Sequence, residues 1–165
     1  MNKKIIACGI LLAAVFAGNP LLAQEKAIEK SCNNYFSSVY YKITEKYGPK
    51  GRNRAIDEWK EIMNSFGLGE FMNNDLAVGA KGKIPSGEFY TKRLGEKWHP
   101  YQSAIFNGMG QGDVLLTPLQ MANIAALIAN RGWFYTPHFV RSIGHKKMIN
   151  KNQFHKTKID AKHFE

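Results

Sequence analysis

Cysteine, proline and acidic residues are scarce in this sequence of 165 residues, and each scarcity excludes a class of protein. Two cysteines are too few for the disulfide framework of a small secreted scaffold. Six prolines and 12% aromatic residues do not fit a disordered or low-complexity chain. No apolar run reaches the roughly 20 residues that a membrane-spanning helix needs. The composition predicts one modest globular domain.

Basic residues are correspondingly abundant. The chain has 23 Lys and Arg against 13 Asp and Glu, which gives a formal net charge of +10. Such an excess favours anionic partners, whether nucleic acid, anionic lipid or an anionic polymer, and the charge alone does not choose among them.

The first 23 residues resemble an export signal. Lys3 and Lys4 form a positive start, residues 5–18 are apolar, and small residues precede a cleavage site that we place after Ala23. An uncleaved membrane anchor is the alternative, and it is disfavoured because residues 19–20, Asn-Pro, interrupt the apolar run.

Export changes the expected partners. Removing residues 1–23 takes away two lysines and no acidic residue, so the mature charge is +8, and Cys32 is then the one remaining cysteine. We therefore expect a periplasmic or cell-envelope location, no nucleic-acid partner, and an anionic cell-wall or membrane surface as the surroundings of the basic chain.

Apolar spacing predicts two helices in the first half of the mature chain. One covers residues 35–47 and ends at Gly48-Pro49, and the other covers residues 56–66 and ends at Gly67. Between residues 68 and 99 the periodicity is lost and glycines recur, which predicts a long surface excursion with little regular structure.

A third helix has the clearest local signal. Thr117 supplies a capping hydroxyl, Pro118 fits the first helical position, and Gln120 stands at the capping-box position. The segment 118–130 is apolar almost all round, so we expect it to be buried on most sides.

Short extended pieces are expected after this helix, at Trp133–Tyr135 and at His138–Val140, which together with the helices predict an α+β fold. Residues 142–165 are rich in lysine and histidine and poor in apolar residues. They predict a loosely ordered basic stretch, with an anion-binding patch as the alternative.

Metal and cofactor sites have no support in the residue pattern. The five histidines are scattered, and one mature cysteine cannot build a thiolate cluster, so we expect no metal site. Residues 108–112 are glycine-rich but lack the dinucleotide and phosphate-loop fingerprints, and a turn that packs closely against a neighbour is the simpler interpretation. We expect no cofactor.

Two segments taken together resemble a known family. The residues AIEKSCNNYF at 27–36 precede GQGD at 110–113, which is followed by TPLQMA at 117–122 and ANRG at 129–132. This ordered combination is similar to the transpeptidase domain of class B penicillin-binding proteins, in particular the elongation type often called penicillin-binding protein 2. The resemblance covers residues 27–141, and within it Ser31-Cys32-Asn33 matches the family's Ser-x-Asn motif.

The resemblance implies a chemistry and two site residues. Enzymes of this family attack a D-alanyl-D-alanine peptide with a serine, form an acyl-enzyme and pass the acyl group to an amine of a neighbouring peptidoglycan strand, and β-lactams mimic the peptide. Ser31 would be the second hydroxyl that relays a proton to the leaving amine, and Asn33 would bind the amide backbone of the stem peptide. Without the resemblance, a helix cap is the simpler role for Ser31.

The family's nucleophile motif, Ser-x-x-Lys, and its Lys-Ser/Thr-Gly motif do not occur in the 165 residues. None of the seven serines has a lysine three positions later, and Lys156-Thr157 is followed by Lys158. We therefore expect residues 24–141 to form a partial transpeptidase domain, a helix-rich fragment of the penicillin-binding protein and serine β-lactamase fold. In the family the helix 118–130 packs on the nucleophile's helix and the sheet, so a fragment without them is expected to be marginally stable and to self-associate.

Three hypotheses follow. The first is a transpeptidase fragment that is inactive alone, with another chain as one source of the missing motifs. The second is an exported, non-catalytic basic module that binds anionic cell-wall polymer or a membrane surface. The third is a gene remnant joined by chance to a signal peptide.

Overall fold

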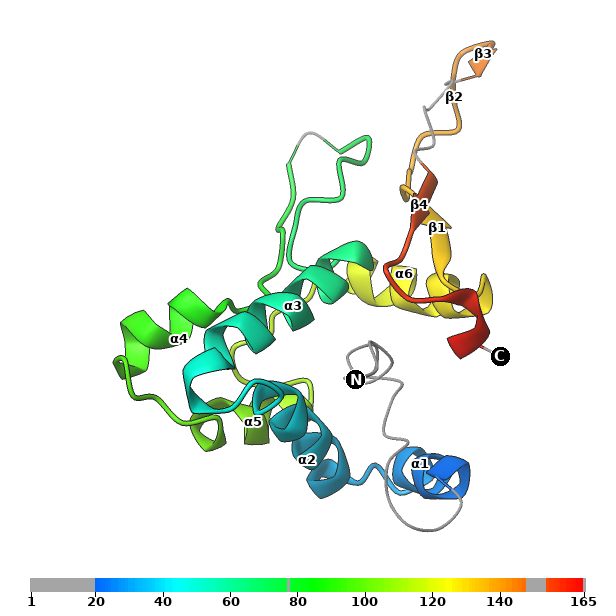
Figure 1. Cartoon of the computed structure of the whole chain (residues 1–165). Coiled ribbons are helices and arrows are strands. Elements are labelled where there is room, and N and C mark those ends of the chain that lie inside the picture. Colours follow the sequence, from blue (N-terminus) through cyan, green and yellow to red (C-terminus); the bar gives the residue numbers. More distant parts are fainter. Residues whose placement is uncertain (1–19, 77, 148–153, 165) are drawn as a thin grey trace. The chain divides into compact units, whose positions relative to one another are not determined.

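Helices make up most of the regular structure in the computed structural model, which describes residues 20–76, 78–147 and 154–164 (Figure 1). In chain order the elements are α1 (Pro20–Glu29), α2 (Asn33–Thr44), a 3₁₀ turn (Pro49–Gly51), α3 (Arg52–Ser65), α4 (Gly87–Leu94), α5 (Tyr101–Gly108), α6 (Pro118–Ala129), β1 (Trp133–Tyr135), β2 (Ser142–Ile143), β3 (Lys146–Lys147), β4 (Phe154–Lys156) and a 3₁₀ turn (Ala161–His163). Within these ranges no helix is long and apolar enough to cross a membrane. The expectation of a mixed, helix-rich α+β fold is confirmed.

The two helices predicted in the first half are present. α2 follows its apolar stripe and buries Tyr40 and Ile43, but it ends at Thr44, a turn earlier than expected. α3 buries Ile56 and Trp59 on one side and is closed by Gly67, whose φ of +79° is the left-handed conformation that glycine adopts readily.

The prediction of little regular structure between residues 68 and 99 is wrong at α4. The Ser86 side chain accepts the backbone N–H of Phe89 at 3.1 Å and begins the helix as an N-cap. Asp57 on α3 accepts the N–H of Gly87 at 2.8 Å, so a second oxygen satisfies the first turn. This tertiary contact stabilises a helix of only eight residues.

The chain forms two compact units. The first consists of residues up to 61 together with 85–114, and the second consists of residues 62–84 together with 115–165. The core of the first unit is aromatic: Tyr40 meets Trp59 edge to face at a centroid distance of 5.1 Å, and Tyr90 lies 5.1 Å from Trp98. All four rings are buried, which makes them the main apolar contribution to this unit.

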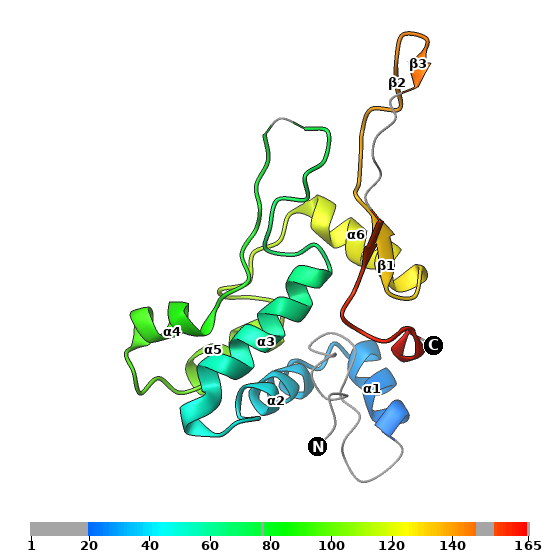
Figure 2. The same ribbon diagram turned by 45° about the horizontal axis from the view of Figure 1, so that its top comes forward.

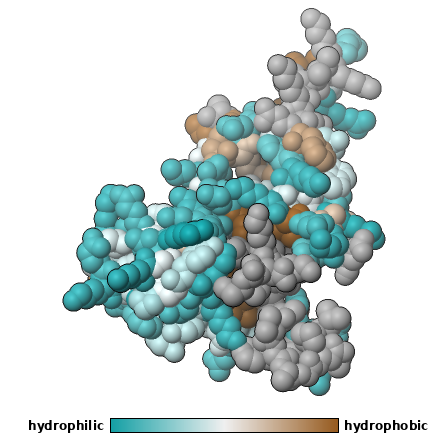
Figure 3. Space-filling model, in the orientation of Figure 1, coloured by the Kyte–Doolittle hydropathy of each residue, from teal (hydrophilic) through white to brown (hydrophobic). Residues whose placement is uncertain are grey.

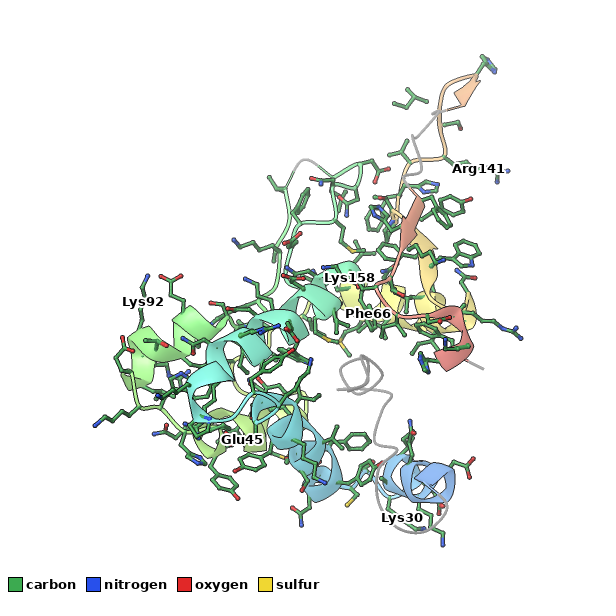
Figure 4. The ribbon with its side chains drawn as sticks, in the orientation of Figure 1. Lys30, Glu45, Phe66, Lys92, Arg141 and Lys158 are labelled. Atoms are coloured by element: carbon green, nitrogen blue, oxygen red, sulfur yellow. The ribbon has the colours of Figure 1, made fainter. Side chains whose placement is uncertain are left out.

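Polar contacts close the edge of that core. Arg52 pairs with Glu45 at 2.7 Å and also donates to the carbonyl oxygen of Trp98 at 3.1 Å. The indole N–H of Trp98 donates to Asn53 at 3.0 Å. The outer surface of this unit is mostly hydrophilic in the view of Figure 3, and charged side chains such as Lys92 project away from the helices (Figure 4).

The second unit contains an antiparallel ribbon in which β1 and β4 lie side by side (Figure 2). Trp133 pairs with Lys156, and Tyr135 pairs with Phe154. A regular strand therefore lies in the stretch 142–165, and Thr157 and Ile159 behind it are buried, so the expectation of loose order is wrong there. The strand expected at 138–140 is absent.

The segment 138–140 is instead fixed by one carboxylate. Asp75 accepts the backbone N–H of Phe139 at 2.9 Å and that of Val140 at 2.5 Å. These bonds lower the pKa of Asp75, first through Val140 and then through Phe139, because they favour the charged form.

The helix α6 begins as predicted. The Thr117 side chain accepts the N–H of Gln120, and the Gln120 side chain in turn accepts the N–H of Thr117, which is a complete capping box with Pro118 at the first position. The expectation that its apolar surface is buried on most sides is wrong. Met121 is 61% exposed and Ile128 is 37% exposed. Four alanines of α6 are exposed as well, namely Ala122, Ala125, Ala126 and Ala129.

The buried side of α6 is instead anchored by two amides. The Gln120 side chain donates from Nε2 to the carbonyl oxygens of Gly67, Glu70 and Lys81 at 3.0–3.1 Å. Asn123 donates to the carbonyl oxygen of Phe66 at 3.1 Å. Both amides are almost fully buried, so α6 is attached to the loop after α3 by hydrogen bonds rather than by its apolar residues alone.

Candidate functional site

Ser31 lies in the turn that joins α1 to α2, and the backbone of this turn is a Schellman motif. The N–H of Ser31 donates to the carbonyl oxygen of Ile28 at 3.1 Å, and the N–H of Cys32 donates to that of Ala27 at 2.8 Å. Ser31 therefore occupies the position after the helix end that most often holds glycine, and its φ of +47° is left-handed.

Both predicted site residues present their side chains at the surface. Ser31 and Asn33 are exposed, and Cys32 between them is half-buried at the N-terminus of α2. The Cys32 side chain does not cap the start of α2. Ser31 caps the end of α1, and it does so through its backbone N–H and not through its hydroxyl. Among residues 20–76, 78–147 and 154–164, no side-chain hydrogen bond of Ser31 or Asn33 is found. In this part of the chain no lysine, histidine or carboxylate is hydrogen-bonded to the serine, so its proposed proton relay remains a prediction.

The glycine-rich segment packs directly against the helix that follows Ser31. A Cβ placed on Gly108, at the end of α5, would lie only 2.5 Å from the Cα of Ser37 on α2. Close packing is confirmed at Gly108, but this residue is the last of α5 and not part of a turn, and Gly110 has open space around it. The Gly108 contact places the end of α5, which precedes the GQGD segment, against Phe36 and Ser37 of α2.

Asn107 holds the same two helices together from inside, and nothing in the sequence pattern indicated it. Its side-chain nitrogen donates to the hydroxyls of Tyr40 on α2 and Tyr90 on α4. Burial raises the pKa of Tyr40 well above its ordinary value and that of Tyr90 to about 12, so both phenols are neutral hydrogen-bond partners at neutral pH. The position of α2 depends on this buried network, and α2 begins where the Ser31 turn ends.

The third motif segment, residues 117–132, belongs to the second unit. It forms α6 and the turn after it, where Gly132 has a φ of +96° and lies against Phe164 and Thr157. No three His, Cys, Asp or Glu side chains converge in a metal-binding arrangement within the described ranges. Each of the two units therefore carries residues of the motif segments. Among the residues that the structure describes, none is placed to act as a catalytic base for Ser31.

Comparison with known families identifies this scaffold. The family model of the penicillin-binding protein transpeptidase domain matches residues 17–165. The chain belongs to this family. It is 31% identical over 125 residues to the peptidoglycan D,D-transpeptidase MrdA of Acinetobacter baumannii and 30% identical over 125 residues to MrdA of Escherichia coli K12.

Solved penicillin-binding proteins share the fold. The PBP2 of Pseudomonas aeruginosa, solved in complex with WCK 5153, superposes with a TM-score of 0.66 at 28% identity, covering 86% of this chain and 30% of that one. The PBP2 of Helicobacter pylori gives a TM-score of 0.65 at 26% identity, covering 86% and 23%. The resemblance inferred from the Ser-x-Asn and glycine-turn segments is confirmed.

The match covers only a part of these relatives. The alignments include 76% of this chain but 17% of the Acinetobacter protein and 18% of the Escherichia one. The chain thus corresponds to a portion of a PBP2-type peptidoglycan D,D-transpeptidase.

Proposed function

We propose that these residues supply the Ser-x-Asn side of a peptidoglycan D,D-transpeptidase site and do not carry out acyl transfer by themselves. The supporting observation is the Schellman turn, which displays the Ser31 hydroxyl and the Asn33 amide at the surface next to the α2–α5 packing. The 165 residues contain neither Ser-x-x-Lys nor Lys-Ser/Thr-Gly, so the pair of groups that would generate and orient a nucleophile is not provided here.

Substrate and partner follow from the same proposal. The acyl donor would be a peptidoglycan stem peptide, β-lactams would be its mimics, and the amide of Asn33 would hydrogen-bond the peptide backbone. The Ser31 hydroxyl would relay a proton once a nucleophile and its lysine are brought beside it. The nucleophile and its lysine must come from residues outside these 165. If those residues are not covalently joined to this chain, a second chain that carries them is the required partner.

Export to the cell envelope is part of the proposal. The support is the basic start at Lys3 and Lys4 followed by an apolar run, and cleavage after Ala23 would fall within α1. The family match begins at residue 17, so cleavage there would remove the first matched residues. The intact mass of the chain recovered from an envelope fraction shows directly whether residues 1–23 are removed.

Incubation with benzylpenicillin followed by intact-protein mass spectrometry tests the catalytic part. We expect no covalent adduct on the folded chain, because no serine has the lysine that activates it. Circular dichroism of the same sample confirms that the helices are folded, and the variant Ser31→Ala is the matched control. A stoichiometric adduct on one serine, lost after denaturation, would show that an active centre exists within these residues and would overturn the proposal.

A further inference from the structure

One face of the β1–β4 ribbon carries three aromatic side chains and a lysine. The register sets Trp133 opposite Lys156 and Tyr135 opposite Phe154. Because side chains alternate between the two faces of a strand, these four residues share one face. We call them the aromatic face of the ribbon.

The opposite face fixes the ribbon to the second unit. Phe134 is buried and stacks on the His155 ring at a centroid distance of 4.8 Å. The Nε2 of His155 lies 2.8 Å from the hydroxyl of Thr136, which holds the imidazole in place. The ribbon is therefore anchored on one side and leaves the aromatic face open to solvent.

The rings of the aromatic face support one another. Trp133 lies 5.7 Å from Phe154 with only 32° between their planes, while Tyr135 meets them edge to face at 5.5 and 5.8 Å. Tyr135 is 50% exposed and Phe154 is 57% exposed. Mutual packing restricts their rotamers, so a ligand would meet a platform that is already ordered.

We propose that the aromatic face binds the sugar rings of an N-acetylhexosamine glycan. One side of a pyranose carries C–H bonds with partial positive charge, which are attracted to the negative face of an aromatic ring, while its hydroxyls remain at the edge in water. Trp133 and Phe154 offer neighbouring ring faces for this contact. The ammonium of Lys156, exposed beside Trp133, can donate to the carbonyl oxygen of an acetamido group.

Size and charge favour a glycan over other ligands of aromatic surfaces. A stable protein interface buries about 800 Å² on each partner, and three half-exposed rings fall well short of that area. Single-stranded nucleic acid also stacks on aromatic rings, but its binding depends on several phosphate-neutralising cations, and this face carries only Lys156. Identifying the glycan as peptidoglycan rests on the proposed function, whereas the aromatic face itself does not.

Titration with chitotetraose, monitored by the indole N–H signals in ¹H–¹⁵N NMR spectra, tests the inference on the full chain. The sequence has three tryptophans, and both Trp59 and Trp98 are buried in the other unit. We expect saturable movement of the Trp133 indole signal alone. Because each ring contact accounts for a large share of the binding, Trp133→Ala should weaken the affinity about tenfold; this variant lacks the reporting indole, so its affinity and that of the unaltered chain are compared by isothermal titration calorimetry.

Phe154→Ala is the second variant, since removing a side chain that is 57% exposed leaves the fold intact, and it should weaken binding in the same direction. Phe139→Ala is the matched control, because Phe139 is equally exposed at 59% in the same unit but lies outside the face. Absence of saturable shifts in the folded chain would overturn the inference, as would equal affinity in Trp133→Ala or equal affinity for oligothymidine. Benzylpenicillin plays no part in this titration, so its outcome is independent of the test of acyl transfer.

Discussion

Replacing Gln120 by leucine should destabilise the second unit although it converts a buried polar residue into an apolar one. The Gln120 amide donates to three backbone carbonyls and accepts the N–H of Thr117, and only 1% of the residue is exposed. Leucine has a similar volume but leaves these groups without partners. An orphaned buried acceptor costs about 1–3 kcal/mol, and some of the carbonyls can turn to water, so we expect a loss of about 3 kcal/mol.

Hydrogen–deuterium exchange is the appropriate assay, because two units that open separately do not give one unfolding free energy. In Gln120→Leu, exchange should accelerate in peptides that cover residues 66–84 and 117–132, while peptides from the first unit keep their protection. A loss of about 3 kcal/mol is a large share of the 5–15 kcal/mol that stabilises a whole domain.

Met121→Ala is the matched control, since Met121 is adjacent on α6 but 61% exposed, and it should change protection by less than about 0.5 kcal/mol. If Gln120→Leu lost no more protection than this control, the hydrogen bonds would not be what attaches α6, and the account of its buried side would be wrong.

Two further predictions concern the Ser31 turn and Asp75. Ser31→Gly should be more stable than Ser31→Ala by about 0.5–1 kcal/mol, because glycine avoids the left-handed penalty at φ +47° but has more freedom in the unfolded chain. Hydrogen–deuterium exchange of peptides that cover residues 27–36 measures the difference, and equal or greater protection in the alanine variant contradicts it. The depressed pKa of Asp75 means that its support for the 139–140 backbone is present above the unfolded pKa and is lost as the pH falls through the folded one. The Val140 amide signal should therefore titrate below the ordinary range of an aspartate and stop titrating in Asp75→Asn, whereas a midpoint at or above that range would refute the contact.

Predictions that rest on local sequence signals were the most reliable. The start of α6 depends on three residues within one turn, Thr117, Pro118 and Gln120, and all three act as the pattern indicates. The start of α4 had a comparable signal in Ser86, which was obscured by the glycines around it. Its stability depends on Asp57, which lies 30 residues away in the sequence.

Non-local contacts explain what the sequence did not reveal. β4 pairs with β1 across 18 intervening residues and contains two polar residues out of three, so nothing in its own pattern identified it. The buried role of Gln120 depends on carbonyls at 67, 70 and 81, which no periodicity places together. Ser31 carries no local sign of its left-handed backbone, since glycine is the usual residue there.

The attachment of α6 through its buried amides has a consequence for any surface that binds its exposed side. The side chains of Gln120 and Asn123 hydrogen-bond α6 to the loop after α3. The helix therefore keeps its length and its position on this loop while Met121 and Ile128 are exposed to water. A surface that docks on this exposed side would not have to fold the helix, and the conformational entropy lost on docking is limited to a few side chains. The affinity of such a contact would therefore depend mainly on the apolar area it removes from water, and it should strengthen with temperature near 25 °C as hydrophobic association does.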